Sequence, residues 1–242
     1  MTLAVVTFLW DKPGYRSKFL PAHVRTMQRM VGRHYQRPHT FHCVTDKVTR
    51  PCRVGAIQLH PLWTKHANVP NPHGPANPSC YRRLKLYSDA ARKQFGERIL
   101  SIDLDMVLVD DVSPLWDRPE PFGFWIDQLN RHGFVNGAMQ LITPGRRDDI
   151  WTGFDPANTP AIAKRAGCWG SDQGVLSYHF KSDKAPPYAT WGTAEGAFSW
   201  RVHCQPHGGL LPSGARVVNF HGQQGDPWEL TERVPWIKEH YR

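Results

Sequence analysis

Two aspartates separated by one residue lie within an apolar stretch of the sequence. Asp103 and Asp105 occur in the run LSIDLDMVLVDD, which covers residues 100–111. In an extended segment, residues i and i+2 point to the same side, so both carboxylates would face one direction. Two such charges repel unless a cation or a proton lies between them, and oxygen ligands suit Mg²⁺ or Mn²⁺. The alternative is a strand that ends in an acidic, solvated turn, because Asp110 and Asp111 follow closely.

The elements before these aspartates predict an α/β fold with a parallel sheet. Residues 98–102 read RILSI and form a predicted strand, and ligands of open α/β sheets bind at the carboxyl ends of strands. Residues 3–10, 40–46 and 53–60 are three further predicted strands. Pro21 suits the first position of a helix, and apolar residues recur after it at helical spacing. Strand, helix, strand and strand in this order indicate an α/β layer.

The middle and the end of the chain are less regular. Residues 61–80 are rich in Pro, Asn, Gly and His, which excludes a helix or a central strand and predicts a long loop. A helix is predicted at about residues 79–95, with Ser79 as its cap. Strands are predicted at residues 133–142 and 215–222, and a helix at residues 170–180. A terminal helix, broken by Pro235, is predicted at residues 228–242. No linker divides the chain, so one domain is predicted.

Composition limits the classes of protein and partner. The 242 residues are 40% hydrophobic and 12% aromatic, which is typical of a globular protein. The net charge of +9 indicates a polyanionic partner such as nucleic acid, an anionic membrane surface or a phosphorylated substrate; the alternative is a basic surface without a special partner. Five cysteines without a CxxC pair are typical of a reduced intracellular protein. No apolar run approaches a membrane span, so we expect a cytoplasmic protein, in the host cytoplasm if it is viral.

Five segments together resemble a known family. The segment ILSIDLDMVLVDDVSPLWD resembles the DxD segment of GT-A nucleotide-sugar glycosyltransferases, in particular the glycogenin-like and lipopolysaccharide galactosyltransferase-like enzymes of family 8 type. The segments CYRRLKLYSDA, GFVNGAMQLITPG, GSDQGVLSYHF and VVNFHGQQGDPW are similar to family motifs that occur in the same order. The resemblance covers about residues 3–230. It implies a single GT-A domain over 1–242, Rossmann-like with a mostly parallel sheet and flanking helices.

The resemblance also implies a division of labour along the chain. Residues 1–105 would form the nucleotide-binding half, and residues 106–242 the sugar and acceptor half. The implied metal ligands, for Mn²⁺ or Mg²⁺, are Asp103, Asp105 and His221. The implied donor contacts are Thr7, Phe8, Trp10, Asp46, Arg83, Asn136, Gly137 and Gly222. The residues implied at the reacting centre and donor sugar are Asp172, Gln173 and Asp127.

The sequence departs from the family pattern near its end. Asn219 stands where glycogenin-like members carry the ligand histidine, and His221 follows as part of FHG, as in other related transferases. Asp226, after an extra residue, replaces a lysine that contacts the donor diphosphate in the family. The resemblance favours transfer with retention of configuration. If transfer inverts configuration, Asp172 is the candidate base.

The predicted function is therefore transfer of a hexose from a nucleotide-diphosphate sugar, such as a UDP-sugar, to an acceptor hydroxyl. The acceptor is predicted to be either a surface glycan or a hydroxymethylated base in phage DNA, and the second would explain the basic charge. One alternative is a non-catalytic module that binds nucleic acid or glycan on a degenerate transferase fold. A metal-dependent nuclease or phosphatase would need more clustered acids than Asp110 and Asp111 supply.

Overall fold

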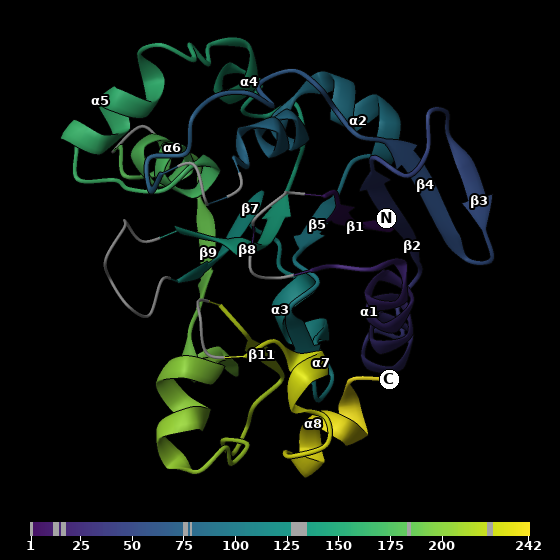
Figure 1. Cartoon of the computed structure of the whole chain (residues 1–242). Helices are drawn as coiled ribbons and strands as arrows, with labels where there is room; N and C mark the ends of the chain where they lie inside the picture. The colour runs from purple at the N-terminus through teal and green to yellow at the C-terminus, as the bar shows by residue number, and fades with distance from the viewer. Residues whose placement is uncertain are drawn as a thin grey trace.

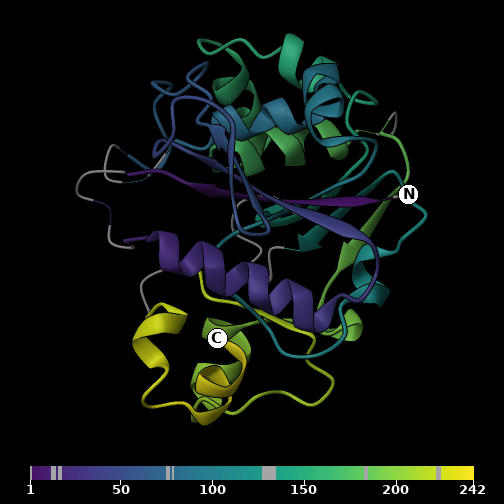
Figure 2. The same cartoon turned by 90° about the vertical axis from the view of Figure 1, so that its right-hand side faces the viewer.

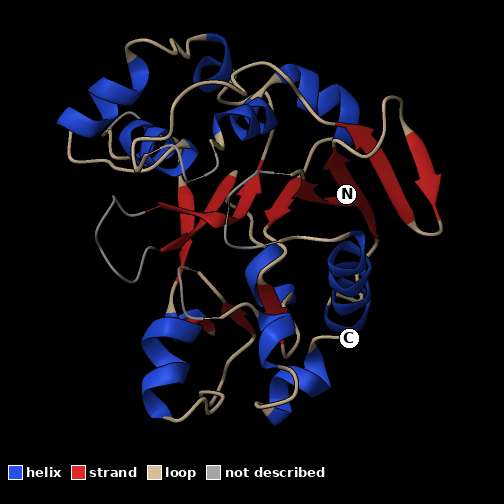
Figure 3. Cartoon of the chain, viewed as in Figure 1, coloured by secondary structure: helices blue, strands red, loops and turns tan. Residues whose placement is uncertain are grey.

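The computed structural model describes residues 2–11, 15, 18–74, 77, 79–126, 135–182, 185–221 and 225–242. Two predicted site residues, Asp127 and Gly222, lie outside this part of the chain. A large central sheet runs through the molecule, and helices cover both of its faces (Figures 1 and 3). Among the described residues, no helix is both long enough and apolar enough to cross a membrane.

The central sheet is mixed but mostly parallel. Its strand order is β3-β4-β2-β1-β5-β8-β7-β9. Parallel pairs join β4 to β2, β2 to β1, β1 to β5 and β7 to β9, whereas β8 runs antiparallel between β5 and β7. The strands are β1 (Leu3–Leu9), β2 (His39–Thr45), β3 (Cys52–Val54), β4 (Ile57–Pro61), β5 (Ile99–Ile102), β7 (Phe122–Ile126), β8 (Val135–Ile142) and β9 (Tyr188–Trp191). The predicted parallel sheet is thus confirmed on the β1 side.

A second, smaller sheet begins directly after the aspartate pair. It consists of β10 (Ala197–Ser199), β11 (Val217–Asn219) and β6 (Met106–Leu108), in the order β10-β11-β6. Asp103 is still tied to the large sheet, because its N–H donates to the Ala138 carbonyl at 2.8 Å. The Asp105 carbonyl instead accepts from the Phe220 N–H at 2.9 Å, which ties it to the small sheet.

The helices form one layer on each face of the central sheet, as the view along the sheet shows (Figure 2). One layer holds α1 (Pro21–His34), α3 (Ser113–Trp116), the π-helix η3 (Trp200–Cys204), the 3-10 helix η4 (Gln205–His207), α7 (Pro227–Leu230) and α8 (Pro235–His240). The other holds the 3-10 helix η1 (Tyr81–Tyr87), α2 (Asp89–Phe95), α4 (Asp149–Thr152), α5 (Thr159–Arg165) and α6 (Asp172–Phe180). A short 3-10 turn, η2 (Thr193–Glu195), follows β9.

Strand β1 shows why the sequence forms a central strand. All seven residues of LAVVTFL are buried, because both faces of the strand are covered. Leu3 and Val5 pack into the core below α1, while Ala4 and Val6 pack into the core below η1, α2 and α6. A strand with apolar residues on both sides is stable only between two helix layers.

One predicted strand is a hairpin instead. Residues 53–60 were expected to be continuous, but β3 and β4 pair antiparallel, with Cys52 opposite Leu59. Gly55 lies in the turn between them with φ +59°, a left-handed conformation that favours glycine. The prediction was wrong because the turn glycine lies inside an otherwise β-rich run.

The predicted helix at residues 79–95 is interrupted at Ser88. A 3-10 helix precedes this residue and α2 follows it. The Ser88 hydroxyl accepts from the Ala91 N–H at 3.1 Å and caps α2, so the cap is not Ser79. The loop predicted for residues 61–80 is confirmed where it is described, because no helix or regular strand lies between Pro61 and Tyr81. Pro235, which was expected to break a terminal helix, is the first residue of α8.

Candidate functional site

A buried arginine joins two carboxylates from different elements at the carboxyl end of β5. Arg83, on η1, donates from Nε to Asp172 Oδ2 at 2.7 Å and from Nη1 to Asp103 Oδ1 at 2.6 Å. The side chains of Arg83 and Asp172 are 8% and 3% exposed, whereas that of Asp103 is 34% exposed. The other Asp172 oxygen accepts from the Ser171 hydroxyl at 3.2 Å. Arg83, Asp103 and Asp172 were all predicted site residues, and the fold brings them together.

The charges of this cluster do not cancel. Burial and the charge of Asp172 raise the pKa of Asp103 to about 6, although Arg83 opposes this shift. Burial disfavours the charge of Arg83, but Asp103 and Asp172 together raise its pKa well above the ordinary value. Two carboxylates therefore share one guanidinium, and Asp105 adds a further carboxylate nearby in the chain. A second cation would be stabilised at this edge of the sheet.

Gly137 and Gln173 lie against the arginine. A Cβ atom at position 137 would lie 2.7 Å from Arg83 Nη2, so the guanidinium occupies the space that a side chain would need. The Gly137 N–H donates to Gln173 Oε1 at 3.4 Å, which brings this predicted residue to the same place. Asn136 Oδ1 instead accepts from the Ala138 N–H at 2.9 Å, so its carbonyl oxygen is held by its own strand.

Potential metal ligands lie next to Asp105. Among the described residues, no group of three or more His, Cys, Asp or Glu side chains is arranged to hold a metal ion. His221 Nε2 is 2.8 Å from the Ser199 hydroxyl in a hydrogen bond. Asn219 pairs with Met106 in the small sheet and is 1% exposed. Within the described part of the chain, neither polar atom of its side chain has a hydrogen-bond partner. Carboxylate and amide oxygens fit Mg²⁺ or Mn²⁺, and the buried Asn219 amide lacks a partner that such an ion would supply.

The residues predicted to bind the nucleotide base and ribose do not all line one cavity. Thr7 is fully buried inside β1, and Phe8 packs edge-on against Trp10 and Trp63. Asp46 accepts from the Asp11 N–H at 2.9 Å and forms an ion pair with a neighbouring lysine. Of the predicted base-pocket residues, Trp10 lines a cavity of about 460 Å³ between the end of β1 and the loop that precedes η1.

Arg82 lines the same cavity, and sequence reasoning missed it. It is 9% exposed, and its guanidinium carbon lies 5.2 Å from the centre of the Trp10 ring. The available signal was the arginine pair in CYRRLKL, of which only Arg83 matched the family motif. Consecutive residues on a tight helix point in different directions, so one arginine can face the aspartates while its neighbour faces the cavity.

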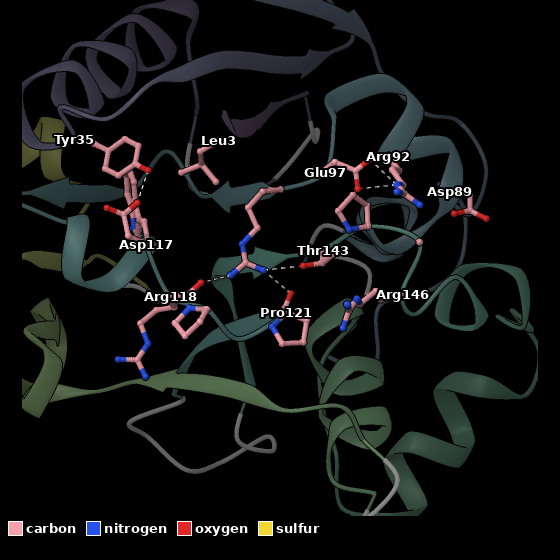
Figure 4. A pocket seen from close by; sticks show the side chains of 15 residues that line it. Leu3, Tyr35, Asp89, Arg92, Glu97, Asp117, Arg118, Pro121, Thr143 and Arg146 are labelled. Carbon is pink, nitrogen blue, oxygen red and sulfur yellow. Dashed lines mark hydrogen bonds and ion pairs between the residues drawn. The ribbon is translucent and has the colours of Figure 1, made fainter. Parts of the chain in front are cut away.

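A larger cavity lies at the opposite edge of the sheet. It has a volume of about 770 Å³, and Leu3, Tyr35, Asp117, Thr143 and Arg146 are among its lining residues (Figure 4). Its polar groups largely satisfy one another. The Tyr35 hydroxyl donates to Asp117 at 2.7 Å. This cavity lies at the start of β1, whereas the Arg83 cluster lies beyond the end of β5.

Comparison with known proteins identifies the fold. No protein-family model matches the chain, and a search of curated proteins finds no match. An active-site mutant of LgtC, in which glutamate replaces a glutamine, aligns at 16% identity and a TM-score of 0.61, over 98% of this chain and 93% of that chain. The chain has the GT-A fold. This confirms the fold class that the sequence motifs implied.

Two further solved structures have the same fold. The galactosyltransferase LgtC in complex with donor and acceptor sugar analogs aligns at 15% identity, with a TM-score of 0.58, over 93% of this chain and 89% of that chain. The glycosyltransferase GlyE of Streptococcus pneumoniae aligns at 12% identity, with a TM-score of 0.56, over 94% of this chain and 56% of that chain. Because the identities are low, this likeness concerns the fold alone.

Proposed function

We propose that the chain is a glycosyltransferase that moves a hexose from a nucleotide-diphosphate sugar, such as a UDP-sugar, to an acceptor hydroxyl. The observation that carries this proposal is the buried Arg83, which holds Asp103 and Asp172 together at the carboxyl end of β5. This is the edge at which open α/β sheets bind ligands. The proposal is further supported by LgtC, which shares the fold and was solved with donor and acceptor sugar analogs.

Asp103 and Asp105 are the proposed ligands of a Mn²⁺ or Mg²⁺ ion. When bound, the ion would neutralise charge on the leaving diphosphate. The predicted third ligand is His221, and the unpaired Asn219 amide supports Asn219 as a competing oxygen donor. Parallel His221→Gln and Asn219→Ala variants would decide between them, because only loss of the true ligand should weaken metal-dependent UDP binding.

The residues of the chain supply the remaining chemistry. Arg83 would stabilise the negative charge that develops on the donor phosphates, because a preorganised guanidinium needs no reorientation during the reaction. Asp172 accepts from both Arg83 and Ser171, so it acts here as a positioning residue and has little freedom to serve as a base. This arrangement supports transfer with retention, which requires no dedicated base. Gln173 would lie beside the donor sugar.

A glycan is the acceptor that we propose. The sugar acceptor analog bound to LgtC supports this choice, whereas a hydroxymethylated DNA base rests on the net charge of +9 and the length of the loop at residues 61–80. The two acceptors differ in a simple measurement. Duplex DNA held through phosphate contacts would dissociate steeply as salt rises, whereas a neutral glycan would not.

The proposed activity is tested by release of nucleotide from UDP-glucose, UDP-galactose and GDP-mannose, with Mn²⁺ or with EDTA. Wild-type protein should release nucleotide only with metal, and Asp105→Asn should lose about 100-fold or more of this rate. Asp110→Asn is the matched control, because it removes an equal charge from an exposed position of the same segment. Equal rates in wild type and Asp105→Asn would refute the proposal. UDP binding without any release would support the binding-module alternative.

A further inference from the structure

Arg82 is a buried cation without a counter-ion. Its residue is 9% exposed, and no carboxylate within the described part of the chain forms an ion pair with it. Among the described residues its side chain makes one hydrogen bond, from Nη1 to the Trp63 carbonyl at 3.3 Å, and its Nε is buried with no partner there. Burial lowers the pKa of Arg82, and Cys80 and Asp46 oppose this only through space. An isolated buried charge is costly, so this arrangement requires an explanation.

Arg98, which is half-buried, shows how this fold satisfies an arginine that has no ion pair. Its Nη1 donates to the Pro121 carbonyl and the Thr143 hydroxyl, each at 2.8 Å. Its Nη2 donates to the carbonyls of Arg118 and Glu120, at 2.9 and 2.5 Å. Arg98 thus has four acceptors, whereas Arg82 has one long contact. The missing acceptors of Arg82 are therefore a feature of its position, since the half-buried Arg98 finds four without an ion pair.

The guanidinium of Arg82 faces a cavity of suitable size. Arg82 lines the cavity of about 460 Å³ together with Trp10, Asn68 and Asn77. The Trp10 ring lies 5.2 Å from the guanidinium carbon and supports one face of it. Arg83, the next residue, points the other way toward Asp103 and Asp172. The two arginines therefore face different sites, the cavity beside Trp10 and the aspartate cluster.

We propose that Arg82 forms a second anion-binding subsite, which takes a phosphate or carboxylate group of a substrate in the cavity beside Trp10. An oxyanion in the cavity would accept from the guanidinium of Arg82, whose Nη1 already contacts the Trp63 carbonyl. The inference rests on the proposed transferase function only for the source of the anion. That source is either a phosphate of the donor nucleotide or an acidic group of the acceptor sugar.

The test compares wild-type protein with Arg82→Met, and uses the thermal midpoint and three anions as readouts. The anions are inorganic phosphate, UDP and glucuronate, each titrated without turnover. Phosphate binding should weaken about 10- to 100-fold in Arg82→Met, as expected for loss of a hydrogen bond to a charged group. Without ligand, the variant should unfold at the same temperature as wild type or higher, because the uncompensated charge is gone. Arg50→Met, at an exposed position, controls for net charge.

The three anions identify the source. An equal loss of UDP affinity assigns the subsite to a donor phosphate, whereas unchanged UDP affinity with weaker glucuronate binding assigns it to an acidic acceptor. Unchanged affinity for all three anions would overturn the proposal, whatever the thermal midpoint. If Arg82→Met fails to fold, Arg82→Gln serves the same comparison, because an amide can still donate to the Trp63 carbonyl. None of these readouts needs catalysis, so failure of the transferase assay would leave them unaffected.

Discussion

Replacement of Arg83 by methionine should destabilise the protein strongly. The change keeps a long side-chain stem but leaves Asp172 and Asp103 without their shared cation. Asp172 is 3% exposed, so its charge would be buried and unpaired, and removal of one partner of a buried ion pair costs about 3–5 kcal/mol. Asp103 adds less, because its side chain is 34% exposed and water screens it.

The free energy of unfolding is measured by urea titration at about pH 8 and about pH 5. Burial raises the folded-state pKa of Asp103 above its unfolded value, and loss of the opposing Arg83 charge would raise this pKa further. A group with a raised folded-state pKa contributes stability that is lost as pH rises through that pKa. The free energy of unfolding that Arg83→Met loses relative to wild type should therefore be larger at pH 8 than at pH 5.

Arg118→Met is the control, because Arg118 pairs with Glu120 at a side chain that is 40% exposed. Exposed pairs contribute less than about 1 kcal/mol, and no comparable pH effect is expected. A loss below about 1 kcal/mol in Arg83→Met, equal at both pH values, would refute the assigned bridge. Asp172→Leu combined with Arg83→Met should recover part of the loss, since the double change leaves no buried charge at that pair.

Two further predictions concern the packing of the site and a buried histidine. Gly137→Ala should destabilise by about 1–3 kcal/mol in urea unfolding, because its Cβ would lie 2.7 Å from a guanidinium that two carboxylates hold. Gly32→Ala, in open space on α1, should instead be neutral or stabilising, and equal effects would contradict the steric argument. Burial and the neighbouring His60 lower the pKa of His42 to about 4. Because the unfolded chain takes up this proton at higher pH than the folded one, the free energy of unfolding of wild type should fall by up to about 3 kcal/mol between pH 6.5 and pH 4. His42→Phe should remove most of this pH dependence of the free energy of unfolding, whereas His207→Gln, at an exposed position, should keep it. An unchanged pH dependence in His42→Phe would show that His42 is not its source.

Much of the fold follows from local sequence pattern. Strand β1 is apolar on both faces and α1 begins at Pro21, and both elements lie where the pattern predicts them. The position of Asp103 at the carboxyl end of β5 was predicted in the same way. Failures occurred where one residue changes the chain direction inside a regular run, as Gly55 does between β3 and β4. Periodicity averages over such single residues.

The site was less predictable because its contacts are distant in the chain. Arg83 and Asp172 are 89 residues apart, and no local pattern reports that their side chains meet. Arg82 and Arg83 are adjacent and chemically identical, so only the fold distinguishes Arg83, which pairs with two carboxylates, from Arg82, which forms no ion pair with a described residue. Asn219 and His221 raise the same difficulty, because their hydrogen bonding depends on the small sheet.

The two sheets divide the aspartate pair between them. The backbone of Asp103 is fixed by Ala138 in the large sheet, while that of Asp105 is fixed by Phe220 in the small one. During synthesis, the first carboxylate can be placed once β8 has emerged from the ribosome. The second must wait for β11, which follows β8 only after α4, α5, α6, β9 and β10. A nascent chain can therefore contain a nearly complete central sheet while the backbone of Asp105 is still unfixed, so the segment that carries β11 sets when both aspartates are held in place.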